Sequence, residues 1–422
     1  MLRYNACKSR FARLLVLYVF LTLLSGAFAA PGVALAQGQP REVVVAAIVS
    51  LTGTNAAWGQ MTWRGIELAA ELINEQGGIK SLGGAPIRVI AADTESNPVV
   101  AGIAAERVIQ QGAIALIGTN QSAATLVVTQ VAERNQVPFI TSTDVEPLIT
   151  ERGFRYTFRT SPLVNAYGRD ILTWVKEQGE RTGIVARKVA FISENSVVGQ
   201  SSVQFGRQAA EELGFEVVDA VTYDAASTQN FTSYLARFRA AGAEVILGHN
   251  KPSDAILITR TLKELNYNPM VYGGMLGGHI SREYVSALGA DANYVIATTS
   301  WSPNVQIEGM DEIKARFREK YGVDMDSTAA AGITSMAVIW EALEQSGTRD
   351  PRRLRDAIAN VELRTGERMY LQLSGVKFDE RGENLRASGV VFMIKDENWI
   401  PIAPTQFAAA EAPWPKPAWG SK

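Results

Sequence analysis

The sequence predicts an α/β protein in which two lobes are built around mostly parallel sheets. Short apolar runs alternate with amphipathic helical segments along the chain, which is typical of βαβ units. The alternation occurs in two series, and the polar stretch 159–162 separates them. After the N-terminal segment no run approaches the ~18 consecutive apolar residues that a membrane span needs. We therefore expect no membrane insertion of the remaining chain.

The first series begins at residues 43–49, which are continuously apolar, as in a strand buried on both faces. The helix that follows has an apolar stripe and stops at Gly77-Gly78. Further strands are expected at 87–92, 114–117 and 137–140. The aligned residues of the three intervening helices are Ile66, Ala69, Ala70 and Ile73, then Ala101, Ala104, Ala105 and Val108, then Ala124, Val127, Val128 and Val131.

The second series has expected strands at 189–192, 215–218, 245–247 and 270–272, and a helix at 230–241. A later helix with Ile333, Met336 and Trp340 in phase, and a strand-rich region from Val376, must join one of the lobes. Periodicity does not decide which lobe they join. The proline-rich end is expected to be an extended tail that its tryptophans could hold against a lobe.

Residues 1–36 have the order of a secretory signal peptide: basic residues, an apolar run, then small residues ending in Ala34-Leu35-Ala36. The basic residues are Arg3, Lys8, Arg10 and Arg13. Cleavage after Ala36 would remove these and the only cysteine, Cys7, leaving 43 acidic residues and a formal charge of −6. A thiol-free chain suits an oxidising compartment, and we expect export to the periplasm. An uncleaved membrane anchor is the alternative, because the apolar run is long for a signal peptide.

The composition excludes several function classes. With 41 basic and 43 acidic residues the chain is not a strongly basic nucleic-acid binder. One cysteine and two histidines, His249 and His279, leave little material for a metal site. Phosphate-binding glycine motifs and a nucleophile elbow are both missing. We therefore expect no metal, no cofactor and no catalytic residue, with a secreted α/β hydrolase as the weaker enzyme alternative.

Polar residues follow the predicted strands, where open parallel sheets place their binding crevice. Asn120 and Thr143 lie in such loops of the first series and Asn250 in the second. Ser122 is expected at a helix N-terminus, where a hydroxyl and unpaired N–H groups can hold an anion. The alternative is that Ser122 merely caps its helix.

Several stretches resemble the periplasmic binding proteins for branched-chain amino acids. They are Ser50-Leu51-Thr52-Gly53, Trp58-Gly59, Gly65-Ile66-Glu67-Leu68-Ala69, residues 74–79, Ile117-Gly118, residues 148–153 and Phe158-Arg159-Thr160. The resemblance covers nearly all of the chain after the signal peptide. It implies the type I fold: two Rossmann-like lobes with parallel sheets, joined by three crossovers and closing on a ligand.

The same resemblance implies the domain bounds and the partners. The first lobe would be 42–161 plus about 298–372, the second 162–297 plus about 373–410, and the tail 411–422. The chain would be the monomeric, periplasmic solute-binding component of an ABC importer, with a small-molecule ligand and a membrane permease as its partners. A membrane-anchored ligand sensor is the alternative from another class.

Ligand roles follow from the resemblance position by position. Ser122 corresponds to the serine that binds the ligand carboxylate, and Trp58 to an aromatic residue against the ligand. Thr143 and Val145 fall in a loop that offers backbone groups to the ligand, and Asn120 and Asn250 lie in the flanking strand-end loops. Val198 replaces a usual tyrosine, and Met275 falls near a position where amino-acid binders have an acid. The family-matched residues are Trp58, Ser122, Thr143, Val145, Val198 and Met275.

No Asp or Glu occurs from residue 270 to 282. An unpaired ammonium in a closed site would cost several kcal/mol, so we predict an aromatic or other apolar carboxylate that lacks an ammonium. The alternative is a hydrophobic amino acid whose ammonium is held by Asp144 or Glu146. Glu194 and Asp254 are two further acids that could accept the ammonium. The opposing interpretation is that all four acids are solvated or cap helices.

Overall fold

The computed structural model describes residues 41–420. The first sheet is parallel throughout, with strand order β2-β1-β3-β4-β5. Its strands are β1 (Val43–Val49), β2 (Ile87–Asp93), β3 (Ala115–Thr119), β4 (Phe139–Thr141) and β5 (Thr157–Arg159). The first four lie where the apolar runs predicted them. The fifth was not predicted, because Thr157–Arg159 has a single apolar residue and forms a strand only by pairing with β4.

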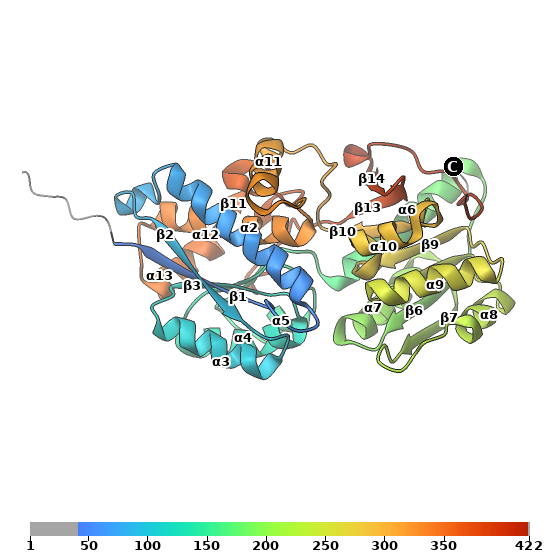
Figure 1. Cartoon of the computed structure of the whole chain (residues 1–422), viewed down its shortest axis with the longest axis horizontal. Helices are drawn as coiled ribbons and strands as arrows, with labels where there is room; N and C mark the ends of the chain where they lie inside the picture. Colours follow the sequence, from blue (N-terminus) through green and yellow to red (C-terminus); the bar gives the residue numbers. More distant parts are fainter. Residues whose placement is uncertain (1–40, 421–422) are drawn as a thin grey trace, which may run out of the picture. The chain divides into compact units, whose positions relative to one another are not determined.

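Helices cover both faces of this sheet (Figure 1). One face packs against α2, α12 and α13, and the other against α3 and α4. The helices are α2 (Ala56–Glu75), α3 (Pro98–Gln110), α4 (Ser122–Asn135), α5 (Leu148–Glu151), α11 (Met310–Tyr321), α12 (Ser327–Ser346) and α13 (Pro351–Ala359). Gly65 lets α2 approach α12 closely, because a Cβ there would lie 2.1 Å from the Ala329 carbonyl oxygen. We call this sheet with its helices the first lobe.

The second sheet has the order β14-β13-β10-β9-β8-β6-β7. Its strands are β6 (Lys188–Glu194), β7 (Glu216–Tyr223), β8 (Val245–Gly248), β9 (Val271–Met275), β10 (Ile296–Thr299), β13 (Val390–Lys395) and β14 (Asn398–Ala403). Strands β6 to β10 are parallel, and β13 and β14 are added antiparallel. Both sheets are thus mainly parallel, and the predicted α/β architecture of two lobes built on mostly parallel sheets is confirmed.

Residues of the second sheet alternate between two apolar layers, as the period of two along a strand requires. On β9, Val271 and Met275 face the layer with α6 and α7, whereas Tyr272 faces the layer with α8, α9 and α10. The helices are α6 (Val164–Thr182), α7 (Val197–Leu213), α8 (Thr232–Ala240), α9 (Pro252–Glu264) and α10 (Arg282–Leu288). We call this sheet with its helices the second lobe.

The chain passes between the two sheets three times. It leaves the first after β5, returns after β10, and crosses again before β13, so that orange α12 lies with the blue strands while red β13 joins the other sheet (Figure 1). Two of these passages differ from the expected bounds. Thr298 and Thr299 still pair with the second sheet in β10. Residues after 372 still belong to the first lobe, since β12 (Val376–Lys377) pairs with β11 (Glu362–Leu363) and Phe378 joins its core.

The C-terminal tail lies against the second lobe. Trp414 packs edge-on against Trp174 of α6, with ring centroids 5.7 Å apart. The Trp419 indole donates to the Tyr267 carbonyl at 2.9 Å. The tail is therefore held by its tryptophans. Between residues 41 and 420 no helix is long and apolar enough to cross a membrane. The predicted signal peptide, 1–36, lies outside the described residues.

Candidate functional site

The carboxyl ends of the first sheet are organised by the buried carboxylate of Asp144. Its Oδ2 accepts hydrogen bonds from the Thr119 N–H at 3.0 Å, the Thr125 hydroxyl at 2.7 Å and the Thr141 hydroxyl at 3.0 Å. These donors come from the end of β3, the first turns of α4 and the end of β4. Asp144 therefore fixes the N-terminus of α4 against the strand ends.

Ser122 is the first residue of α4, as the sequence predicted, but it does not cap that helix. Gln121 occupies the N-cap position and makes no side-chain cap. Among the described residues the Ser122 hydroxyl has no hydrogen-bond partner, although the residue is only 5% exposed. The first N–H groups of a helix lack partners within it, and α4 has 14 residues. A hydroxyl and a helix N-terminus are thus available together for an anion.

Asn120 and Thr143 are brought together beside this helix start. The Asn120 Nδ2 donates to the Thr62 hydroxyl at 2.7 Å and to the Thr143 hydroxyl at 3.2 Å. Its Oδ1 is buried without a partner in the described part of the chain. Trp58, in the first turn of α2, is half-buried, and no hydrogen bond or ring contact links it to the other candidates.

The four acids considered as ammonium partners are not solvated. Asp144, Glu146, Glu194 and Asp254 are between 4% and 8% exposed, so the solvated interpretation was wrong. Asp144 already accepts three hydrogen bonds, and Glu146 accepts one from the Ser201 hydroxyl at 2.8 Å. Both acids therefore have partners before any ligand is considered.

A polar cluster occupies the corresponding edge of the second sheet. The Tyr223 hydroxyl, at the end of β7, lies 2.9 Å from Asp254 Oδ2 and 3.1 Å from Asn250 Oδ1. A tyrosine has one hydroxyl hydrogen, which can serve one of these oxygens at a time. The Asn250 Nδ2 is buried without a partner in the described chain. Asn250 therefore keeps unused hydrogen-bonding capacity.

Glu194 belongs to the same edge, at the end of β6. Its carboxylate lies 3.8 Å from the His249 Nε2 and 3.8 Å from the Lys251 Nζ, beyond hydrogen-bond distance. Burial lowers the pKa of His249, and the Glu194 carboxylate opposes that shift. A histidine with a pKa below 6.5 is neutral at pH 7, so Lys251 is the cation that faces Glu194.

Val145, Val198 and Met275 meet in one apolar cluster, with Val198 at its margin. Met275 is 2% exposed, and its Sδ would lie 2.9 Å from a Cβ added at Gly168 of α6. Met275 thus packs between the sheet and α6. Where the sequence suggested a residue facing the ligand, the structure has a core residue.

Arg159 was quoted for the resemblance but was not predicted as a site residue. Its side chain is fully buried at the end of β5. The guanidinium donates to the Asp144 carbonyl at 2.8 Å and the Glu146 carbonyl at 2.5 Å, and forms an ion pair with Glu383 at 3.1 Å. Burial lowers the pKa of Arg159, and the nearby carboxylates, Glu383 foremost, oppose this shift. A charged residue inside an otherwise strand-like segment was the only sequence signal for this role.

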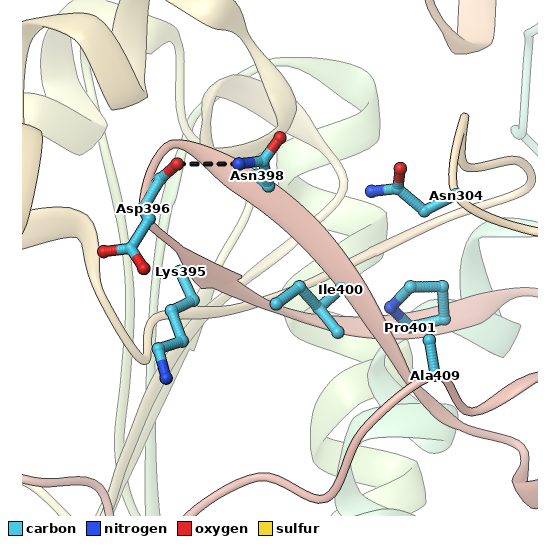
Figure 2. A pocket seen from close by; sticks show the side chains of 7 residues that line it. All are labelled: Asn304, Lys395, Asp396, Asn398, Ile400, Pro401 and Ala409. Atoms are coloured by element: carbon cyan, nitrogen blue, oxygen red, sulfur yellow. Dashed lines mark hydrogen bonds between the residues drawn. The ribbon is translucent and has the colours of Figure 1, made fainter.

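No metal centre is built in the part of the chain that the structure describes. No group of three His, Cys, Asp or Glu within 41–420 could hold a metal ion. A surface hollow of about 340 Å³ lies on the β13–β14 hairpin (Figure 2). Its asparagine amides are already used, since Asn398 donates to the Asp396 carbonyl and Asn304 to the Trp399 carbonyl. The hollow contains none of the predicted site residues.

Comparison with known proteins decides the family. Residues 42–389 match the family model described as periplasmic binding protein. The chain belongs to this family. The resemblance inferred from the sequence motifs is therefore confirmed.

The relatives of this periplasmic binding protein include transport proteins for branched-chain amino acids. It is 26% identical over 383 residues to Leu/Ile/Val-binding protein homolog 7 of Brucella suis, with 89% of this chain and 94% of that one covered. A crystal structure of a leucine-binding protein from Thermotoga maritima superposes with a TM-score of 0.72 at 23% identity, covering 86% of this chain and 98% of that one. Similarity is thus to substrate-binding proteins of the branched-chain amino-acid type of ABC transporter.

A second similar structure was solved with a ligand that is not an amino acid. It is a solute-binding protein of an ABC transporter from R. palustris in complex with benzoate, with a TM-score of 0.71 and 19% identity, covering 90% of this chain and 99% of that one. The same fold therefore accommodates ligands with and without an ammonium group.

Proposed function

We propose that this periplasmic binding protein delivers a small carboxylate without an ammonium group, aromatic or otherwise apolar, to an ABC importer. The observation that carries the proposal is the Ser122 hydroxyl, which has no partner in the described chain and lies at the N-terminus of α4. That arrangement suits a carboxylate. The absence of an acid from 270 to 282 supports the lack of an ammonium partner.

Other candidate residues support the binding of the carboxylate and of polar ring substituents. Asn120 keeps an unpartnered acceptor and Asn250 an unpartnered donor in the described residues. Trp58 is half-buried and would supply an apolar surface against the ligand. In the proposal Thr143 and Val198 also contact the ligand. Val145 and Met275 are buried in this structure. In the proposal they line the core behind the ligand and do not contact it.

A thermal-shift comparison tests this proposal. Benzoate, 3,4-dihydroxybenzoate, benzamide and leucine would be added at equal concentrations to the purified protein. We expect the two acids to raise the Tm, since a ligand at 100 times its Kd adds about 2.7 kcal/mol to stability. Benzamide and leucine should leave it unchanged. A shift produced by leucine alone would refute the ammonium-free ligand.

Ser122→Ala tests whether the Ser122 hydroxyl binds the carboxylate of the ligand. It should abolish most of the shift produced by benzoate and leave the unliganded Tm nearly unchanged. The control is Ser346→Ala, which removes a serine that bonds to the Ala342 carbonyl at the C-terminal end of α12. If the Tm shift produced by benzoate is not reduced in Ser122→Ala, the role of Ser122 in carboxylate binding is contradicted.

A hydrophobic amino acid is the second candidate ligand, and Glu194 is the observation that favours it. Its buried carboxylate faces Lys251 at 3.8 Å without a direct hydrogen bond, so an ammonium could approach it. Asp144 and Glu146 are weaker partners because both already accept hydrogen bonds. Glu194→Gln should then abolish leucine binding if this candidate is right and leave benzoate binding intact otherwise.

We further propose that the protein works in the periplasm as a monomer after cleavage at Ala36. The N-terminal pattern of charge, apolar run and small residues supports export. N-terminal sequencing of the exported protein should begin at Gln37. An intact N-terminus in the membrane fraction would instead favour the anchored sensor.

A further inference from the structure

The loop at 144–146 is tied to the first crossover through three consecutive carbonyl groups. The Arg159 guanidinium binds the carbonyls of Asp144 and Glu146, and the Val164 N–H binds the carbonyl of Val145 at 3.0 Å. Residues 159–164 are where the chain leaves the first sheet for α6. The loop therefore cannot shift without moving the start of the crossover.

Arg159 also reaches the third crossover. Its Nε donates to the Glu383 carboxylate at 3.1 Å, and its backbone N–H donates to the Gly382 carbonyl at 2.8 Å. Glu383 in turn accepts from the Thr150 hydroxyl of α5, which Arg159 also contacts at 3.2 Å. One side chain thus joins the 144–150 segment, the first crossover and the segment that leads to β13.

The fork of the guanidinium suits this task. Its N–H groups point in fixed directions, so two carbonyls and a carboxylate can be bound at once. Glu383 is the carboxylate that forms an ion pair with the buried Arg159, and removal of either partner of such a pair is costly because it leaves an unpaired buried charge. Removing the charges of both Arg159 and Glu383 avoids leaving either one unpaired. The effect of losing the hydrogen bonds that position the loop can then be measured apart from the cost of an unpaired charge.

We propose that Arg159 is a positioning residue for ligand binding. It fixes the loop that carries Thr143 and Val145 to the first crossover and, through Glu383, to the third. Lobe movement and the geometry of this loop are thereby coupled, because the residues that hold the loop are those at which the chain changes lobes. The inference rests on the proposed function only in taking the 143–146 loop as part of the binding site.

The test uses the double variant Arg159→Met with Glu383→Gln in the full-length exported protein. Its control is Arg368→Met with Glu341→Gln, which removes an ion pair of 2.8 Å elsewhere in the first lobe. Dissociation constants for benzoate and leucine would be measured by calorimetry well below each Tm. We expect at least about tenfold weaker binding of whichever probe the unsubstituted protein binds, and less than about twofold change in the control. Unchanged affinity in the Arg159 double variant would overturn the proposal.

Hydrogen exchange of the unliganded proteins supplies a readout that needs no ligand. Amides of 142–151 should exchange at least about tenfold faster in the Arg159 double variant, while the rest of the first lobe keeps its rates. Exchange that is unchanged, or that rises equally across the lobe, would overturn the positioning role. If neither probe binds the unsubstituted protein, the proposed function fails and the exchange result alone decides this inference.

Discussion

The Ser201 hydroxyl of α7 donates to the Glu146 carboxylate at 2.8 Å, which joins the second lobe to the loop after β4 of the first. Glu146 is 5% exposed, so little water competes for this bond. Val145, the residue before Glu146, belongs to an apolar cluster made mostly of second-lobe residues. The contact between lobes at this point is therefore polar at one residue and apolar at its neighbour.

A double-mutant cycle should detect this bond. We expect Ser201→Ala and Glu146→Ala, each of which removes the bond, to weaken ligand binding by similar factors, and their combination to cost little more than either. The coupling should be about 1 kcal/mol, the net value of one hydrogen bond. Titration calorimetry of the four proteins checks it. If Glu146 held a ligand ammonium instead, Glu146→Ala would cost leucine far more affinity than Ser201→Ala does.

Asp144 should contribute to stability and not to ligand charge recognition. Asp144→Asn replaces the carboxylate oxygen that accepts three hydrogen bonds with a neutral amide oxygen. Hydrogen bonds to a charged acceptor are the stronger kind, so we expect a loss of about 2 kcal/mol in unfolding free energy. Denaturant unfolding measures it. Asp356→Asn is the control, because that aspartate is exposed and pairs only with Arg355 at the surface. Equal stability of the two variants would contradict the assigned role.

The stability of the protein should depend on the protonation of Asp170 in α6. Burial raises the pKa of Asp170 from 3.8 to about 6, while Arg169 and the Gly389 N–H oppose the shift. The folded state then binds more protons than the unfolded state between these two pH values. The contribution of Asp170 to unfolding free energy should therefore fall as pH rises from about 4 to about 6, and stay constant above.

Asp170→Asn removes this dependence. The variant should gain stability over the unsubstituted protein as pH rises through this window, by up to about 3 kcal/mol at pH 7. Unfolding at pH 4.0, 5.0, 6.0 and 7.0 is the measurement. A stability difference that does not change between pH 4 and pH 7 would show that the carboxyl group is not buried as the structure has it.

Apolar periodicity was sufficient to predict the strands and helices whose own residues carry the pattern of burial. The run 43–49 predicted a strand with the bounds of β1, and Ser122 was expected at the start of α4. Strand β5 lacked an apolar run and depends on its neighbour β4 for pairing. Residues 376–378 join the first lobe through contacts with a distant segment, so periodicity had no means of assigning them.

The candidate site shows the same division. Strand-end loops located Asn120, Thr143 and Asn250, because a parallel sheet brings such loops to one edge. The partners of Arg159 could not be read from the chain, since Glu383 lies 224 residues away. Met275 was assigned to the ligand through the family resemblance, but the alternation along β9 directs its side chain into the α6 layer.

The turn that carries Glu383 should tolerate no side chain at Gly382. This glycine has a φ of +80°, and a Cβ there would lie 2.1 Å from the Thr157 carbonyl oxygen of β5. Gly214 is a matched control, with a φ of +88° and open space around it. Gly214→Ala should cost about 1 kcal/mol, the strain of a left-handed residue. Gly382→Ala should cost at least twice as much in denaturant unfolding, because the turn must also move away from β5. Gly382→Ala should also weaken ligand binding, since Glu383 would move with the turn and leave Arg159 without its carboxylate. Equal stability and equal ligand affinity of the two alanine variants would contradict this account.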